Sequence, residues 1–433
     1  MSSRNFRETF LPLKYPDFGK LFLGQFISNI GSQFSYIALQ FLIFDLTGEI
    51  AAMAVLAIAE VIPMVLIGPF AGVLIDRYDR KYIMAIANFS QAFIIFMIPA
   101  TAIFSGVDRI IAIIILAFMN STFNRFFFPS RGASIPKLID DKDDLFGANS
   151  LSAGAYQTSA LIGPMLAGFI IGIYGYDLPF IIDGLSFIIS SICILSISKS
   201  LKPIRDSTKK QSPINDLVIG GRFIYNFQPI FYILLLFSFL MFAGGGALFL
   251  LIPFLELEFG LTQRGQRELI YGIMIAISAG VGMIFALFLS KKKRLARPIT
   301  MMTYSLIMAG IIFIGFGLAP NIPILALAFV GFGTIEVVVG IPLQTIAQET
   351  VPDDLRGKVF SFINLAVSTS QIIGMGIVSI LAYYLEIRGT FIFNGLIMVI
   401  FSFLGFYWIR KKSLEKLAQI KREEFHQASE SDH

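Results

Sequence analysis

The chain has 433 residues, of which 56% are hydrophobic and only 15% charged, and its formal net charge is +5. This composition, with a mean hydropathy of +0.76, excludes an ordinary soluble domain and predicts a protein of the lipid bilayer. The single cysteine, Cys193, excludes an internal disulfide, and both histidines, His426 and His433, lie in the polar C-terminal tail. A histidine metal site is therefore excluded, and we expect no cofactor.

The first predicted helix follows a polar N-terminus. Residues 1–20 are too polar for a cleavable signal sequence, so the first apolar segment is predicted to direct insertion. Crossing roughly 30 Å of hydrocarbon takes about 20 residues, and backbone groups in lipid must bond within their own segment, so each long apolar segment is predicted to be a helix. Twelve such segments occur, at 18–44, 50–75, 82–104, 108–129, 145–172, 178–198, 228–255, 268–290, 298–318, 322–348, 357–384 and 389–410.

These segments predict an all-α membrane protein with twelve transmembrane helices in two pseudo-symmetric six-helix bundles. The bundles are residues 1–198 and 228–410, and a polar tail occupies 411–433. Between them, residues 199–227 form a predicted cytoplasmic linker, whose second part has the helical spacing of an interfacial helix. Asp-Asp-Leu-Phe-Gly before the fifth segment and Asp-Asp-Leu-Arg-Gly before the eleventh indicate an internal repeat.

The basic residues predict the orientation of the chain. Lys and Arg accumulate on the cytoplasmic side of a membrane, and most of the 34 basic residues fall on one side when both termini are placed in the cytoplasm. Those left on the outer side are Arg109, Arg264, Arg267 and Arg388. This bias explains the basic charge without a nucleic-acid partner and predicts a multi-pass membrane protein with both termini in the cytoplasm.

The first segment carries a stripe of polar residues at spacings of four, four, three and four: Gln25, Asn29, Gln33, Tyr36 and Gln40. These residues share one helix face. Neutral amides suit an uncharged or amphiphilic substrate, and the alternative is a polar contact between packed helices. Further candidates for a substrate cavity are Asn120, Asn124 and Gln344.

Three carboxylates fall inside apolar segments, where a charge is costly and therefore usually functional. Glu60 and Glu336 lie near the midplane and are the candidates for coupling protons to transport, with a polar seam between helices as the alternative. Glu336 is the stronger candidate because it begins a polar face that includes Gln344. Asp183 has Asn394 as its partner in the repeat, and a structural hydrogen-bonding role is favoured there.

The loop after the second segment, Gly72-Val-Leu-Ile-Asp76-Arg77-Tyr78-Asp79-Arg80-Lys81, resembles the loop between spans two and three of the major facilitator superfamily. The family pattern is Gly-x-x-x-Asp-Arg/Lys-x-Gly-Arg/Lys-Arg/Lys, and Asp79 replaces its second glycine. In that family the loop acts as a conformational latch on the cytoplasmic side. The resemblance carries this role onto Gly72, Asp76, Arg77, Arg80 and Lys81.

The fifth segment contains Gly163-Pro164, preceded by Ser150 and Ser159 and followed by Ala167. The spacing resembles the antiporter signature of the same superfamily, with serine and alanine in place of three glycines. Small residues on one face let two helices approach and slide, while the proline permits a bend.

The resemblance covers nearly the whole chain, and its closest subgroup is the macrolide-efflux-like multidrug exporters of bacteria. It implies proton-coupled antiport of an amphiphilic small molecule by alternating access, usually by a monomer. A span-four arginine motif of many drug antiporters is missing, although Arg125 lies near the inner end of that segment. A lysolipid or siderophore carrier is the alternative, followed by a receptor or membrane enzyme that does not transport. No catalytic residues gather at an interface and no phosphate-binding loop appears, so neither an enzyme nor an ATP-driven pump is expected.

Overall fold

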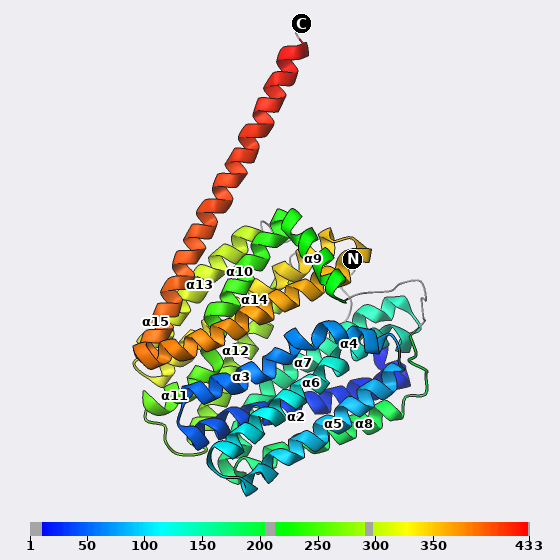
Figure 1. Ribbon diagram of the computed structural model, residues 1–433, viewed down its shortest axis with the longest axis vertical. Coiled ribbons are helices and arrows are strands. Elements are labelled where there is room, and N and C mark those ends of the chain that lie inside the picture. The colour runs from blue at the N-terminus through cyan, green and yellow to red at the C-terminus, as the bar shows by residue number, and fades with distance from the viewer. Residues whose placement is uncertain (1–10, 204–212, 291–297, 432–433) are drawn as a thin grey trace.

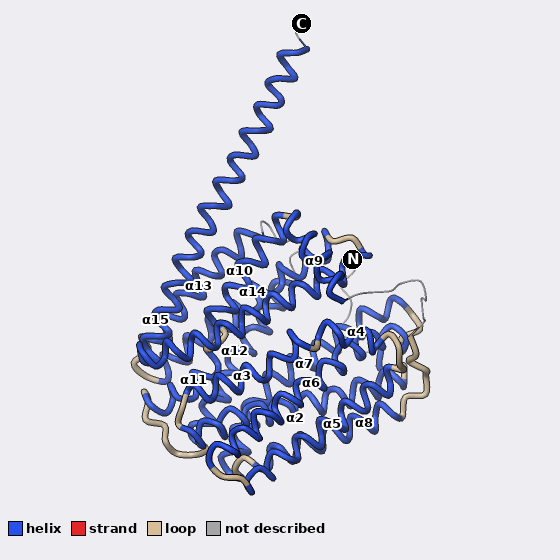
Figure 2. The backbone as a smooth tube through the Cα atoms, viewed as in Figure 1, coloured by secondary structure: helices blue, strands red, loops and turns tan. Residues whose placement is uncertain are grey.

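The computed structural model describes residues 11–203, 213–290 and 298–431 (Figure 1). Every regular element in these ranges is a helix, and they contain no strand (Figure 2). The helices are η1 (Leu11–Lys14), α2 (Pro16–Thr47), α3 (Ile50–Leu66), α4 (Gly68–Ile75), α5 (Arg80–Ala100), η2 (Thr101–Ile103), α6 (Gly106–Leu138), α7 (Lys142–Tyr174), α8 (Asp177–Leu195), α9 (Pro213–Asn226), α10 (Gln228–Gly244), α11 (Ala247–Leu257), α12 (Gln266–Ser290), α13 (Pro298–Leu318), α14 (Ile322–Thr350) and α15 (Asp353–Ser431).

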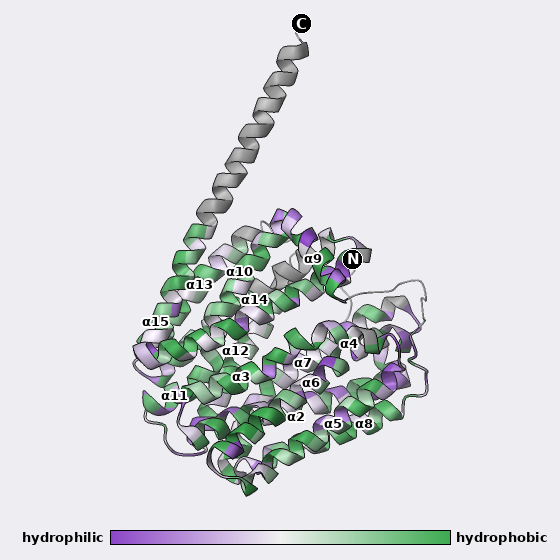
Figure 3. Cartoon of the chain, viewed as in Figure 1, coloured by the Kyte–Doolittle hydropathy of each residue, from purple (hydrophilic) through white to green (hydrophobic). Residues whose placement is uncertain are grey.

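Many of these helices are built to face lipid. Eight helical stretches of the described chain are long and apolar enough to cross a membrane. Large apolar side chains such as Phe93 and Leu327 are 65% and 69% exposed, which is the pattern expected where hydrocarbon replaces water. Hydrophobic residues run along the helices, and hydrophilic residues gather at the ends of the bundle, for example at α9 (Figure 3). The all-helical membrane fold is thus confirmed, whereas the number of twelve spans stays a prediction.

The helices form two groups that follow the chain. In Figure 1, α2 to α8 are coloured blue to green and lie together, and α10 to α15 lie beside them in green to red. The groups meet where α3 packs against α15 and where α7 packs against α12. One large core cluster of buried residues runs through both groups, so the interface between them is a packed hydrophobic contact.

Two predicted helices are interrupted, and a third break falls between two predicted segments. The second predicted segment divides into α3 and α4 at Ile67, because Gly68 and Pro69 start a new helix more readily than they continue one. The seventh divides into α10 and α11 at Gly245. The long α15 contains a break at Glu386, whose φ of 58° lies in the left-handed region, between the eleventh and twelfth predicted segments.

The linker helix α9 packs against the start of α15. Asp216 of α9 forms an ion pair with Lys358 of α15, with 2.8 Å between Oδ1 and Nζ. At Gly220 the helices touch so closely that a Cβ would lie 2.7 Å from the carbonyl carbon of Lys358. The other face carries Ile214 and Tyr225, which are 63% and 74% exposed. An apolar face beside a charged one is the composition of a helix at a membrane interface.

Candidate functional site

A central cavity of about 980 Å³ lies among the helices, and its wall contains both polar and apolar side chains. Its volume is at the upper end of the range for small-molecule sites. Most of the wall comes from α2, α3, α4 and α6, and α15 contributes three residues. The carboxamides in the wall are Gln25, Asn29, Gln33, Gln91, Asn120, Asn124 and Asn364.

The structure brings most of the predicted cavity residues together. Four members of the α2 stripe line the cavity, as do Asn120 and Asn124 of α6. The fifth member, Gln40, lies behind the wall, where it is 1% exposed and donates from Nε2 to Glu60 Oε2 at 3.1 Å. Gln344 lies on α14, and its side chain is outside the described residues.

Several polar atoms of this wall are buried without a hydrogen-bond partner in the described structure. They include Gln25 Oε1, Asn29 Nδ2 and Gln91 Oε1. Leaving such an atom unpaired costs about 1–3 kcal/mol, so water or a bound ligand is required to satisfy it. The wall therefore offers both donors and acceptors to a ligand.

Glu60 reaches the cavity from α3 and is held by two neighbours. Gln40 donates to its side chain, and Ser121 Oγ of α6 donates to its backbone oxygen. Arg125 lines the same cavity, where its Nη2 donates to Ser121 Oγ at 3.3 Å and its Nη1 lies 3.3 Å from Met64 Sδ. Glu60 and Arg125 thus share Ser121 as a neighbour. The second predicted coupling residue, Glu336, lies on α14 with its side chain outside the described residues.

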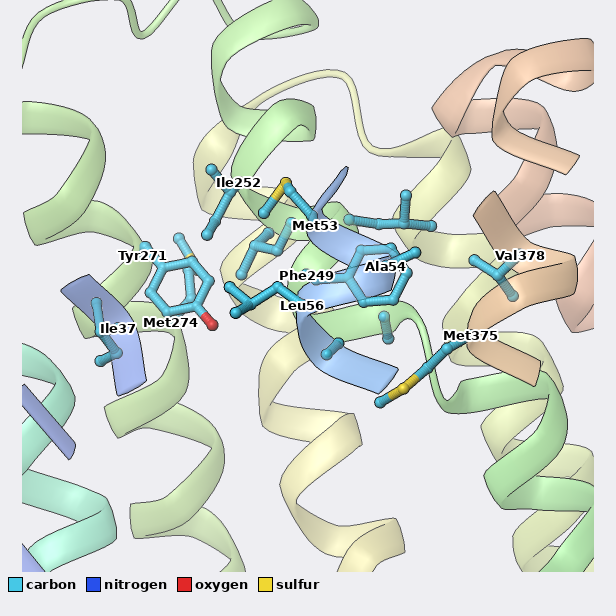
Figure 4. Packing of buried hydrophobic residues seen from close by; sticks show 14 of the residues in the cluster. Ile37, Met53, Ala54, Leu56, Phe249, Ile252, Tyr271, Met274, Met375 and Val378 are labelled. Carbon is cyan, nitrogen blue, oxygen red and sulfur yellow. The ribbon is translucent and has the colours of Figure 1, made fainter. Parts of the chain in front are cut away.

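At one end the cavity reaches the predicted latch loop. Gly72 and Phe128 line it there and are exposed to solvent. At the other end a hydrophobic layer from both helix groups fills the space (Figure 4). Leu56 of α3 and Ile252 of α11 are 0% exposed in this layer, and Tyr271 of α12 stacks edge-on against Phe41 at 5.3 Å. The cavity is therefore accessible from one end and closed at the other.

Beyond this layer, Arg267 of α12 joins three carboxylates. Its Nη2 lies 2.7 Å from Asp45 Oδ1 at the end of α2 and 2.9 Å from Glu268 Oε1. It also pairs with Glu256 of α11. Because Asp45 belongs to the first helix group and the other carboxylates to the second, the arginine clamps the two groups together at the closed end. The Arg267 side chain is 5% exposed and that of Glu268 is 0% exposed, whereas the side chains of Asp45 and Glu256 are each 27% exposed.

Tyr176, in the turn between α7 and α8, completes this cluster. Its hydroxyl donates to Asp45 and lies 3.4 Å from Glu268 Oε1. Burial and the hydrogen bond to Asp45 raise the pKa of Tyr176 far above its usual range, so the phenol stays neutral and remains a donor. A second pair at the same end joins Arg388 Nε to Glu258 Oε2 at 2.6 Å.

The polar contacts described for the predicted latch loop are with the first helix group. Asp76 and Arg77 are exposed, and Asp76 Oδ1 lies 3.8 Å from Arg80 Nη2. Arg80 Nη1 donates to the carbonyl of Ala133 at 2.9 Å, and Lys81 Nζ donates to a backbone carbonyl after α8 at 2.6 Å. Sequence reasoning expected these charges to pair with acidic loop residues when this side closes, and that latch role stays a prediction.

Asp79, which replaces the family glycine, is the N-cap of α5. Its Oδ1 accepts from the backbone N–H of Lys81 at 3.0 Å, and its φ of −66° needs no glycine. The Asp79→Ala variant is expected to lose about 0.5–2 kcal/mol of stability, because the first turn of α5 loses its cap. Thermal unfolding in detergent measures the loss, and Asp79→Asn, which keeps the acceptor, should unfold close to the unchanged protein. Equal midpoints for all three would contradict the capping role.

The antiporter-like motif of α7 lies in helix contacts. A Cβ at Gly163 would lie 2.6 Å from Gln33 Cβ, so α7 approaches the polar stripe of α2 closely there. Ser159 and Ala167 are 0% exposed, and Ser159 Oγ donates to the carbonyl of Ala155 at 2.9 Å. Ser150 lies on the same helix, as does Pro164, whose carbonyl oxygen is in close contact with Gly272 of α12. Small residues thus appear where α7 packs most tightly.

Fold and cavity together define a membrane transporter for small molecules. The profile of the Major Facilitator Superfamily matches residues 21–371 and, in an overlapping second match, residues 350–431. The chain therefore belongs to the major facilitator superfamily. It is 24% identical over 393 residues to macrolide efflux protein A of Streptococcus pyogenes, covering 88% of this chain and 93% of that protein.

Two further similarities bear on the site. The staphyloferrin A transporter of Staphylococcus aureus is 24% identical over 400 residues, covering 92% of this chain and 96% of that protein. Among solved structures, a bacterial homologue of the iron transporter ferroportin in its inward-facing state superimposes with a TM-score of 0.70 at 16% identity, covering 90% of this chain and 98% of that one. The structural likeness establishes the fold.

Sequence reasoning missed the charge cluster at the closed end. Arg267 was noted only as one of the basic residues on the outer side. The adjacent pair Arg267-Glu268 and the aspartate Asp45 at a predicted helix end were visible, but nothing in the spacing joined residues 222 positions apart. Gln91 of α5, which donates to Asn120 Oδ1 at 3.2 Å across the cavity wall, was also missed.

Proposed function

We propose that this protein exports an amphiphilic small molecule from the cytoplasm in exchange for protons, by alternating access. The observation that carries the proposal is the cavity, which has an amide-rich wall, a carboxylate in contact with it and one closed end. The bias of basic residues supports a cytoplasmic position for the latch loop, and hence for the accessible end. The chain then faces inward, ready to take up substrate, as a monomer in a bacterial inner membrane with both termini cytoplasmic.

Glu60 is proposed to carry the exchanged proton. It is a cavity-lining carboxylate held by Gln40, so protonation changes a hydrogen bond within the wall itself. Proton entry from the outside and substrate release would then alternate at one site. Glu336 remains a second candidate from its place in the sequence.

The test is proton flux in proteoliposomes loaded with a pH-sensitive dye. Macrolides and other amphiphilic drugs are added, and the rate of drug-dependent proton movement in each variant is compared with the rate in the unmodified protein. Glu60→Gln is expected to reduce this rate at least tenfold, because the amide cannot take up a proton. The remaining rate should match that of empty liposomes. Glu336→Gln is measured in parallel. Glu49→Gln, an exposed carboxylate next to the same helix, should keep the full rate.

The proposal fails if Glu60→Gln and Glu336→Gln both retain drug-dependent proton flux. If the unmodified protein is folded but shows no drug-dependent proton flux, a dedicated carrier becomes the better interpretation. A siderophore-like substrate is the second candidate, because the wall holds more carboxamides than aromatic rings and a relative is the staphyloferrin A transporter. Uptake or release of a labelled siderophore by the same liposomes distinguishes the two.

A further inference from the structure

A small pocket of oxygen atoms lies in the cavity wall where α2 meets α8. Its centre is the carboxyl group of Asp183 on α8, which is 1% exposed. Ser32 Oγ of α2 lies 3.5 Å from Asp183 Oδ1, and Ser186 Oγ of α8 lies 3.3 Å from the same atom. Ser35 of α2 faces this carboxyl group as well. The serines and the carboxylate thus surround one point at the edge of the cavity.

Two buried atoms of this pocket lack a hydrogen-bond partner in the described structure: Asp183 Oδ2 and Ser35 Oγ, the latter on a side chain that is 3% exposed. Asp183, Ser32 and Ser35 all line the cavity, so an ion can reach them from it. An unpaired carboxylate oxygen in an apolar bundle is costly. A cation that enters from the cavity would satisfy both of these oxygens at once.

The helices are shaped to bring these oxygens together. A Cβ at Gly31 would lie 2.8 Å from Asp183 Oδ1 and closer still to Ser186 Oγ. Only glycine allows α2 and α8 to approach at this level. The pocket is therefore built by a close helix contact.

Ser186 Oγ donates to the backbone carbonyl of Asp183 at 2.7 Å, but the distances from the serine hydroxyls to the carboxylate suit a shared cation better than direct hydrogen bonds. Hydroxyl–oxygen hydrogen bonds usually span about 2.5–3.0 Å, and the two distances to Oδ1 are 3.5 and 3.3 Å. Neighbouring ligands of one cation at about 2.4 Å in octahedral geometry lie roughly 3.4 Å apart, whereas Mg²⁺ at about 2.05 Å would draw them to roughly 2.9 Å.

The charge of the pocket selects a monovalent ion. Asp183 supplies one negative charge, and the serines are neutral ligands. No group of three or more His, Cys, Asp or Glu residues able to hold a metal occurs in the described chain. A divalent cation would leave an uncompensated positive charge inside the membrane, while Na⁺ would leave the site neutral.

We propose that Asp183, Ser32, Ser35 and Ser186 form a sodium-binding site in the wall of the transport cavity. The binding stands on these atoms alone, and its role as a second coupling ion rests on the proposed export function. An inward sodium gradient would then add to the driving force, because the ion and the substrate occupy the same cavity.

The experiment is ion-dependent thermal stability of the purified protein, in NaCl, KCl or choline chloride at constant ionic strength. The unfolding midpoint is expected to rise saturably with Na⁺ and not with choline, because the ion binds the folded state alone. Ser35→Ala is expected to weaken the apparent Na⁺ affinity at least tenfold, because it removes one of the oxygen ligands. Asp183→Asn should abolish the Na⁺ response.

Asp177→Asn, an exposed carboxylate in the first turn of α8, is the matched control and should keep the full response. A Na⁺ response that survives in Asp183→Asn, or equal stabilisation by Na⁺ and choline, overturns the proposal. Stabilisation of the unmodified protein by lower pH alone, lost in Asp183→Asn, overturns it in favour of a proton site. Sodium binding that persists when no drug-dependent flux is found leaves this site intact and refutes only the export function.

Discussion

Arg267→Gln is expected to open the closed end of the protein. Arg267 is 4% exposed, and it pairs with Asp45 across the two helix groups and with Glu256 and Glu268 within the second. The variant leaves three carboxylates without their common cation. Removing one partner of a buried ion pair typically costs about 3–5 kcal/mol. Of these pairs, only that with Asp45 joins the two helix groups, so its loss disfavours the closed conformation and shifts the equilibrium toward the outward-open state by roughly tenfold.

Cysteine labelling measures this shift. In a Cys193→Ser background, Leu56→Cys places a reporter in the hydrophobic layer of Figure 4, where Leu56 is 0% exposed. A membrane-impermeant maleimide added from outside should label it at least tenfold faster once Arg267 is replaced by glutamine.

Arg264→Gln is the matched control for this measurement. Arg264 lies at the same end of the protein and is exposed, with its guanidinium 5.0 Å from the ring centre of Tyr176. Replacing it should leave the labelling rate nearly unchanged. If both arginine variants behave alike, or if neither changes the rate, the clamp does not hold the closed end.

Gly272→Ala is expected to open the same end by a different route. A Cβ at Gly272 of α12 would lie 2.9 Å from the Cα of Met165 on α7, and closer to the carbonyl oxygen of Pro164. Both neighbours are backbone atoms, which cannot rotate away as a side chain can. The helices must separate, at a cost of about 1–3 kcal/mol for overpacking. The conformation that needs this contact is disfavoured, so labelling at Leu56→Cys should rise and the unfolding midpoint should fall.

Gly154→Ala provides the comparison. Gly154 lies on α7 as well, but a Cβ there meets no atom within 4 Å. This variant tests glycine replacement in the same helix without the steric clash, and its labelling rate and unfolding midpoint should stay close to those of the unchanged protein. An equal response of Gly272→Ala and Gly154→Ala would mean that the contact between α7 and α12 does not hold the closed state.

The stripe on α2 shows how far sequence reasoning reaches into the site. Residues spaced by three and four share a helix face, and Gln25, Asn29, Gln33 and Tyr36 do line the cavity. The same rule predicted that Gln40 lines the cavity as well. Its side chain instead lies behind the wall, where it donates a hydrogen bond to Glu60. Periodicity fixes the relative directions of side chains on one helix, but not the neighbour that each of them meets.

Asp183 illustrates the same limit. Its place inside an apolar segment marked it as unusual, and a structural hydrogen-bonding role was expected. The structure surrounds it with two serines of α2, a helix about 150 positions earlier in the chain, as the separation of 151 to Ser32 shows. That pocket depends on the approach of two helices at Gly31, which no local pattern encodes.

The sequence by itself determined that the chain is a helical membrane protein of this superfamily, because hydrocarbon forces backbone groups to bond locally and leaves helix length and polarity as local properties. It also marked the latch loop and the polar faces. Only the tertiary structure decided which end of the cavity is closed and what closes it. Arg267 and Asp45 are 222 positions apart, and the contact between them depends on how two preformed helix groups pack, which is a property of the whole chain.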